Sequence, residues 1–171
     1  MNSMSRGYND CNRRDRDREE ERCQALVKCG CPSSVQVPAL SVVGSTAELT
    51  LATLTLDTSC FCDPNIKLDF TSNVVATVAA FVGTIDIQIF KQCRGQLNRV
   101  PIGPTWHIGS LAALSSTAFS FFICDSDSCL DECCTYTAVA TVNAVAAIAL
   151  GTSINNATLA ATVTCKRSCH K

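Results

Sequence analysis

A chain of 171 residues, 47% of them hydrophobic, is long enough to bury one sizeable core, so we expect a single domain. The formal net charge is only −1, and no long-range field exists to attract nucleic acid or an anionic membrane, so we expect neither as a partner. The most apolar stretch, residues 74–82, is shorter than the roughly 20 residues of a membrane-spanning helix.

Residues 1–28 form a charged segment that we interpret as a flexible N-terminal arm or connector. Residues 13–22 are almost continuously charged with alternating sign, and such a segment cannot pack into a core. A short salt-bridged helix over 15–22 is an alternative. The arm carries Cys11 and Cys23, which we select as candidate intersubunit disulfide residues because an extended tether could reach a neighbouring subunit.

Residues 29–165 have the composition of a β-sheet domain, and residues 166–171 form a C-terminal tail. Charges become sparse from Cys29 onward, and apolar and polar residues alternate over 66–71 and 84–89, which predicts strands with one buried face. Other segments rich in β-branched residues are predicted strands: 35–43, 48–56, 74–82, 117–124, 135–143, 158–165 and a shorter one around Trp106.

Turn-forming residues separate these segments at 31–34, 63–65, 101–104 and 154–156, with strand spacing mostly near ten residues. This pattern predicts an all-β fold, a single jelly-roll-like β-sandwich of about eight strands. Alanine propensity alone would allow a helix over 138–150, but the interleaved Thr and Val favour a strand.

The thirteen cysteines give the chain the composition of a disulfide scaffold, which is typical of oxidising environments. Because thirteen is odd, at least one thiol must stay free, bind another group or pair with another molecule. The Cys-x-Cys spacing is a weak zinc signal, so disulfides are our main interpretation and zinc is the alternative. The candidates for disulfides within the domain or between subunits are Cys29, Cys31, Cys60, Cys62, Cys93, Cys124, Cys129, Cys133, Cys134, Cys165 and Cys169.

The acidic segment 124–134 resembles a calcium loop only superficially. Asp125 and Asp127 are not followed by the glycine and glutamate that an EF-hand needs, so we interpret the segment as a solvated loop held by cystines. Adjacent Cys133 and Cys134 are expected to tie two different strands.

Catalytic residues are not indicated by any pattern in the chain. The two histidines, His107 and His170, have no local signature of a paired cysteine nucleophile, and no phosphate loop or dinucleotide fingerprint occurs. We therefore expect a protein that is not an enzyme and that has no cofactor.

Four motifs resemble a cysteine-rich family of uncharacterised proteins from clostridia and related spore-forming bacteria. These are Cys60-Phe-Cys-Asp-Pro-Asn-Ile-Lys-Leu-Asp-Phe-Thr-Ser-Asn73, Gln88-Ile-Phe-Lys-Gln-Cys-Arg-Gly95, Ser120-Phe-Phe-Ile-Cys124 and Cys134-Thr-Tyr136. The resemblance covers most of residues 22–165, and it implies a source more than a mechanism.

A looser, architectural likeness is to bacterial endospore appendage subunits, which are small cysteine-rich jelly rolls with a flexible N-terminal connector. It implies that Cys11 and Cys23 crosslink stacked subunits and that strands of neighbours complete a shared sheet. We therefore expect a structural subunit that self-assembles into a disulfide-crosslinked extracellular fibre on the spore surface, with itself and other spore-surface proteins as partners.

The chain opens without a basic stretch and apolar segment, so we expect synthesis in the mother-cell cytosol without a signal peptide and exposure by cell lysis. The alternatives are a spore coat or exosporium network protein, a zinc-binding module and a carbohydrate-binding adhesin. One tryptophan and two tyrosines leave little to stack on sugars, which counts against the adhesin.

Overall fold

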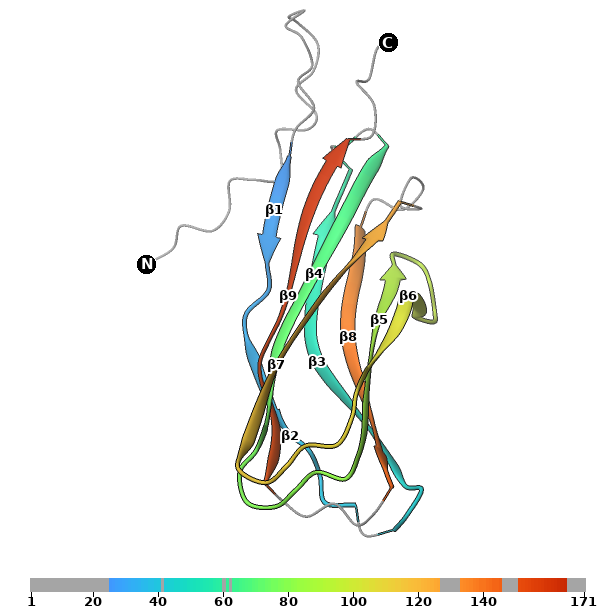
Figure 1. The fold of residues 1–171 in the computed structure, drawn as a ribbon. Coiled ribbons are helices and arrows are strands. Elements are labelled where there is room, and N and C mark those ends of the chain that lie inside the picture. The colour runs from blue at the N-terminus through green and yellow to red at the C-terminus, as the bar shows by residue number, and fades with distance from the viewer. Residues whose placement is uncertain are drawn as a thin grey trace, which may run out of the picture.

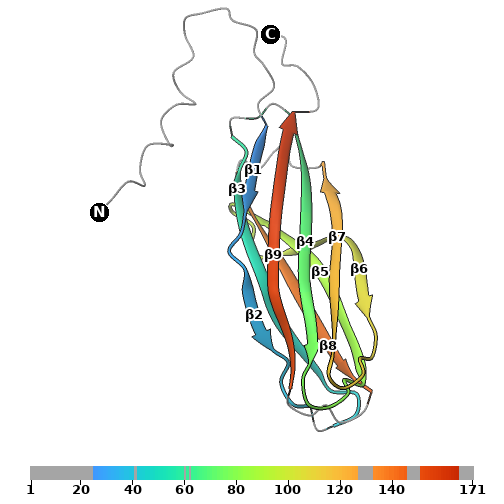
Figure 2. The same cartoon turned by 60° about the vertical axis from the view of Figure 1, so that its left-hand side comes forward.

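Two antiparallel β-sheets packed face to face make up the described part of the protein (Figures 1 and 2). The computed structural model describes residues 25–40, 42–59, 61, 63–126, 133–145 and 151–165. Within these ranges, no helix has the length and apolarity needed to cross a membrane.

The first sheet has the order β1-β9-β4-β7, with β2 pairing β9 beyond β1, and the second has the order β3-β8-β5-β6. If β1 and β2 are counted as one interrupted strand, the described residues form eight strands. Their connectivity is that of a jelly roll, so the predicted fold class is confirmed. The strands are β1 (Leu26–Cys29), β2 (Ser33–Gln36), β3 (Thr46–Asp57), β4 (Pro64–Ala76), β5 (Gly83–Cys93), β6 (Val100–Ile108), β7 (Ser115–Asp125), β8 (Cys133–Ala144) and β9 (Thr152–Cys165).

The core lies between the sheets because alternate residues of each strand point inward. In β5 the inward residues are Ile85, Ile87 and Ile89, and all three are buried. The facing sheet contributes Leu68 and Phe70 of β4, among others. Burying one such side chain stabilises the fold by about 1.5–3 kcal/mol, so this alternation is the main source of stability.

Consecutive strands from β3 onward run in opposite directions, which gives the sandwich two distinct ends (Figure 1). At the end that we call the cysteine end, β3, β5, β7 and β9 finish and β4, β6 and β8 begin. At the opposite end, which we call the apolar end, β4, β6 and β8 finish and β3, β5, β7 and β9 begin. The four connections there run over 37–45, 77–82, 109–114 and 145–151, of which residues 41 and 146–150 lie outside the described residues.

Most predicted strands are confirmed, including 66–71 in β4, 84–89 in β5 and the short strand around Trp106, which is β6. Residues 138–144 lie in β8, so the strand interpretation holds there rather than the helical one. The first sheet begins at Leu26, three residues before the boundary placed at Cys29. Residues 1–24 and 166–171, with the possible helix 15–22, lie outside the described residues.

Two predicted strands were wrong in extent. Of 35–43, only the first two residues lie in β2, because Pro38 has no N–H to continue the ladder after Val37 has bonded to Thr152. Of 74–82, the first three residues complete β4, and the chain then turns before Phe81 bridges to Leu111.

Two predicted turns were also wrong, since both lie inside strands. The Pro-Ile-Gly-Pro segment 101–104 belongs to β6, an edge strand, where prolines are tolerated, and the Gln88 amide donates to the carbonyls of Ile102 and Gly103 at the bulge. The segment 154–156 belongs to β9, where Asn156 adopts a φ of 54° at a register shift opposite β4.

Substitution of Gly83 tests the packing of the sheet that carries β5. A Cβ at this position would clash with the backbone oxygen of Asn143, so we expect Gly83→Ala to lower the free energy of unfolding by about 1–3 kcal/mol. Gly109→Ala is the matched control because a Cβ there meets nothing within 4 Å. Urea unfolding of both variants measures the difference, and equal stabilities would contradict the packing described.

Candidate functional site

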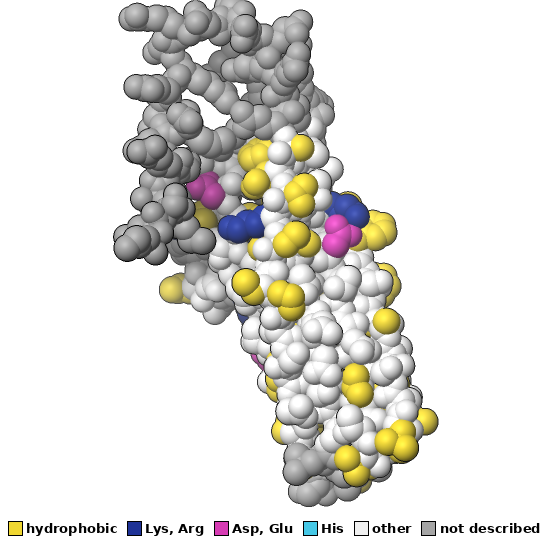
Figure 3. Space-filling view, turned by 90° about the vertical axis from the view of Figure 1, so that its left-hand side faces the viewer, with side chains coloured by type: hydrophobic (Ala, Val, Ile, Leu, Met, Phe, Trp, Pro, Cys, Tyr) yellow, Lys and Arg dark blue, Asp and Glu magenta, His cyan; other side chains and the backbone are white. Residues whose placement is uncertain are grey.

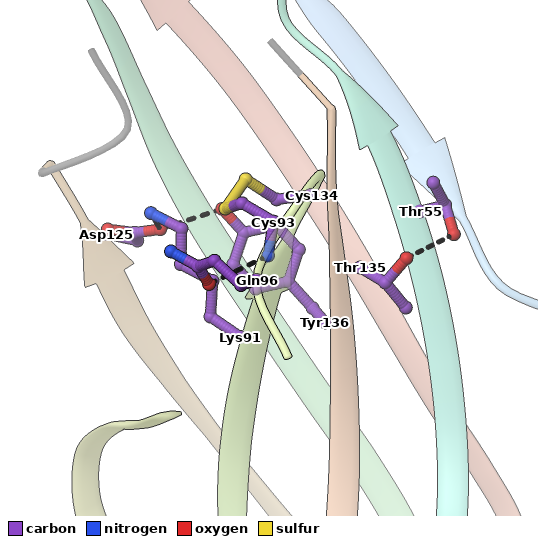
Figure 4. Close-up of a disulfide and its surroundings, with 8 residues drawn as sticks. All are labelled: Thr55, Lys91, Cys93, Gln96, Asp125, Cys134, Thr135 and Tyr136. Atoms are coloured by element: carbon purple, nitrogen blue, oxygen red, sulfur yellow. Dashed lines mark hydrogen bonds and ion pairs between the residues drawn. A yellow bond between two sulfur atoms is a disulfide. The ribbon is translucent and has the colours of Figure 1, made fainter. Parts of the chain in front are cut away.

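A buried polar cluster joins the two sheets at the cysteine end (Figure 4). Lys91 Nζ lies 2.9 Å from Asp125 Oδ2, and the Tyr136 hydroxyl donates to the same oxygen at 2.7 Å. Lys91 and Tyr136 are register partners on β5 and β8, whereas Asp125 ends β7 of the other sheet. The cluster therefore connects the sheets through polar atoms inside the sandwich.

Next to this cluster, Cys93 and Cys134 form a disulfide between β5 and β8 (Figure 4). The two cysteines are direct register partners and both face inward, where they are buried. The Arg94 N–H donates to the Cys133 carbonyl at 3.0 Å, which continues the β5–β8 pairing past the end of β5, and the Cys93 N–H donates to Gln96 Oε1 at 3.1 Å in the turn that follows. The disulfide thus fixes the start of the β5–β6 hairpin.

The surroundings of Tyr136 suit a neutral hydroxyl. Burial, then the hydrogen bond to Asp125 and the nearby negative charge, raise the pKa of Tyr136 far above its usual value. A buried carboxylate needs such donors, because an uncompensated buried charge strongly destabilises a fold. Lys91 and Tyr136 together supply them.

Exposed thiols lie on the outer faces of the sandwich. Cys29 and Cys124 both point outward from the first sheet, and Cys31 is also exposed with a free thiol. Cys133 is a half-buried free thiol on the outer face of the second sheet, since its neighbour Cys134 faces inward. The outer face of the first sheet carries few charged groups (Figure 3).

The register keeps Cys29 and Cys124 apart. Cys29 pairs with Ala160 of β9, Ala160 pairs with Asp69 of β4, and Asp69 pairs with Phe122 of β7, two residues before Cys124. Three strand spacings amount to about 14 Å, whereas a disulfide requires Cα atoms within about 7 Å. These two thiols cannot pair with each other within one folded chain.

The remaining candidates are placed as follows. Cys165 ends β9 half-buried, in register with Pro64, and His107 lies on the outer face of β6 with Nδ1 2.6 Å from Asp86 Oδ1. Within the described ranges, no group of three or more His, Cys, Asp or Glu side chains could hold a metal ion. The candidates outside the described residues are Cys11, Cys23, Cys60, Cys62, Cys129, Cys169, His170 and Asp127.

Hydrophobic side chains are exposed on the connections of the apolar end, whose lower surface in Figure 3 shows apolar groups without charged ones. Leu114 is 84% exposed and Val78 is 75% exposed. The four connections contain no Lys, Arg, His, Asp or Glu. The exposed residues here are Val42, Val43, Val78, Val82, Leu114 and Val145.

The buried cluster was missed by the sequence reasoning, although a signal for it existed. Lys91 continues the inward series Ile85, Ile87, Ile89 and therefore occupies a core position of an alternating strand. A lysine there requires an acidic partner inside the fold. Nothing in the sequence shows that this partner is Asp125 of the other sheet, nor that Cys93 pairs with Cys134.

Removal of the Tyr136 hydroxyl tests the cluster. We expect Tyr136→Phe to lower the free energy of unfolding by about 1.5–3 kcal/mol at neutral pH, because a buried side-chain acceptor, that of Asp125, loses a donor. Above pH 10 the free energy of unfolding of the wild type should also fall by about 1.4 kcal/mol per pH unit, because tyrosine ionises there only in the unfolded chain. The variant has no hydroxyl at this position and should lack this pH dependence. Urea unfolding measures both, with Thr135→Val, which removes an exposed hydroxyl pair, as the control. A variant as stable as the wild type would contradict the role of Tyr136.

Solved structures similar to this chain come from infectious bursal disease virus. The Gx strain structure matches with a TM-score of 0.51 at 12% identity over 85% of this chain and 33% of the viral chain. The Gt strain gives 0.52 at 11% identity over 81% and 32%, and the VP2 subviral particle gives 0.50 at 12% identity over 84% and 33%. The chain thus spans about a third of the length of these chains, and the likeness shows the fold alone.

No curated protein matches this chain. The family is shown instead by a match to a family model. The family model described as "Domain of unknown function (DUF4489)" matches residues 23–164, which covers the whole sandwich almost to the end of β9. The chain therefore belongs to this family.

Proposed function

We propose that this protein is a non-enzymatic structural subunit that self-assembles into a disulfide-crosslinked extracellular fibre on the surface of a bacterial spore. The observation that carries the proposal is the placement of Cys29 and Cys124. Both are exposed free thiols on one outer face, and the register keeps them too far apart to pair with each other. In an oxidising environment such thiols are available to other copies of the chain.

Edge strands supply a second means of contact. β3 and β7 are edge strands of 12 and 11 residues, and each has a single pairing neighbour among the described strands. Long edge strands present backbone groups that can pair with another chain. A head-to-tail contact that does not close into a ring propagates as a fibre.

The apolar end favours contact between copies as well. Burial of the exposed Val78 and Leu114 side chains in a contact between copies would be favourable because it removes apolar surface from water. The four connections contain no charged residues, so this contact would not take an ion of theirs out of water.

The N-terminal arm is the proposed partner of the exposed thiols. Cys11 and Cys23 precede β1, which begins at the cysteine end, so an arm of this length could reach an adjacent subunit. The likeness to endospore appendage subunits supports this arrangement and the location on the spore surface. Other spore-surface proteins are further proposed partners.

A spore coat or exosporium network is the second candidate, and Cys133 is the observation that favours it. Its thiol lies on the outer face of the second sheet, opposite the face that carries Cys29 and Cys124. Crosslinks on both faces would branch an assembly rather than extend it in one direction. Helical order in the assembled material would favour the fibre, and a planar or irregular network would favour the coat.

Isotope mixing tests the intersubunit disulfides. Equal amounts of ¹⁴N- and ¹⁵N-labelled chains are mixed in reduced form, oxidised together and digested without reduction. We expect disulfide-linked peptides that contain Cys29 or Cys124 to include mixed-label pairs, because the two copies exchange partners at random.

Cys29→Ser and Cys124→Ser should each remove their own mixed-label peptides and lower the yield of covalent oligomers. Ser120→Ala is the matched control, since it changes an exposed residue of β7 without removing a thiol. Linked peptides of a single label only, from chains shown to be mixed, would overturn the intersubunit role.

A further inference from the structure

The Lys91–Asp125 pair differs from the exposed ion pair of the same chemical type in this protein. Lys67 and Asp69 lie 2.7 Å apart with side chains 46% and 40% exposed. Lys91 and Asp125 lie 2.9 Å apart with side chains only 9% and 5% exposed, and they come from different sheets. The two pairs therefore have similar N–O distances but differ in their exposure to water.

Burial makes the ionic form of the inner pair costly. Two charges taken out of water lose their hydration, which their mutual attraction only partly replaces. Transfer of one proton from the ammonium to the carboxylate gives a neutral amine in contact with a neutral acid, and a site that excludes water opposes this neutralisation less than water does. The two groups are also held in place by β5 and β7, which removes the entropy cost of bringing them together.

We propose that Lys91 and Asp125 condense into an intramolecular isopeptide bond. After the proton transfer, the lone pair of Lys91 Nζ attacks Asp125 Cγ, and a new N–C bond forms. A second proton moves from the nitrogen to the departing hydroxyl, the C–O bond breaks, and one water leaves. An ammonium and a carboxylate thus become a neutral secondary amide and water, with no change of oxidation state and no cofactor.

Tyr136 has a defined part in this step. Its hydroxyl donates to Asp125 Oδ2 at 2.7 Å, and Lys91 Nζ lies 2.9 Å from the same oxygen, so Oδ2 takes the proton of the ammonium and leaves as water. A hydrogen-bond donor on Oδ2 draws electron density away from Cγ and stabilises the charge that develops on Oδ2 as the Cγ–Oδ2 bond breaks. Because β8 and the adjacent Cys93–Cys134 disulfide hold Tyr136 beside Lys91, the donor is in place before the reaction.

The bond would tie the two sheets covalently. The Cys93–Cys134 disulfide joins β5 to β8 within the second sheet, and the isopeptide bond joins β5 to β7 of the first sheet. Unlike a disulfide, this link resists reductants. It forms within one chain, so it does not depend on the proposed assembly.

The intact mass of the full chain tests the proposal directly. The purified protein is denatured, fully reduced and alkylated, so that every disulfide is opened before mass spectrometry. We expect a mass lower by one water than that of the sequence with all its cysteines alkylated, and a branched peptide that links Lys91 to Asp125 after digestion. The full sequence mass in folded, aged wild-type protein would overturn the proposal, and so would a water loss that maps to a single unbranched peptide.

Variants assign the bond. Lys91→Arg and Asp125→Ala should each restore the full mass, while Lys67→Arg at the exposed pair should leave the deficit unchanged. Since substitutions in the core can impair folding, wild-type protein recovered from inclusion bodies directly into denaturant, and so never folded, provides a second measurement: the water loss should be absent before refolding and present after it. Water loss in chains that have never folded would contradict a bond made by the fold.

Discussion

Each strand residue in a two-sheet sandwich faces either the core or the outside, and the apolar core decides which. The inward series Ile85, Ile87 and Ile89 fixes the phase of β5, and every later residue of that strand follows from it. The same constraint on β8 turns Cys134 inward and Cys133 outward. Among the described cysteines, packing thus brings the inward Cys93 and Cys134 together within the chain and places Cys29, Cys124 and Cys133 on outer faces.

The polar cluster at the cysteine end depends on the same phase. Lys91 and Tyr136 face inward because they continue the core positions of β5 and β8, and Asp125 reaches them from β7 of the opposite sheet. Replacing such a cluster with apolar residues is often neutral or stabilising, so its presence is not explained by stability alone. Covalent closure between the sheets gives these residues a role that a core of hydrocarbons could not fill.

Much of the fold was predictable because alternation with a period of two is local, as in β4 and β5. Strand ends were less predictable because they depend on neighbours: Pro38 ends β2, whereas the prolines of 101–104 are tolerated since β6 is an edge strand. Asn156 resembles a turn residue but occupies a bulge that only the pairing with β4 requires. The Cys93–Cys134 disulfide and the Lys91–Asp125 contact each join segments that are distant in sequence. Strand register and sheet packing bring these segments together, and no short motif encodes either of them.

We propose above all that folded jelly-roll subunits become a covalent polymer through their outward thiols. Negative-stain electron microscopy of the purified protein, paired with gel electrophoresis after boiling with and without reductant, distinguishes such a polymer from a monomer. We expect ordered filaments whose subunits enter the gel only when reduced. Protein that runs as a monomer with or without reductant and shows no filaments would contradict it.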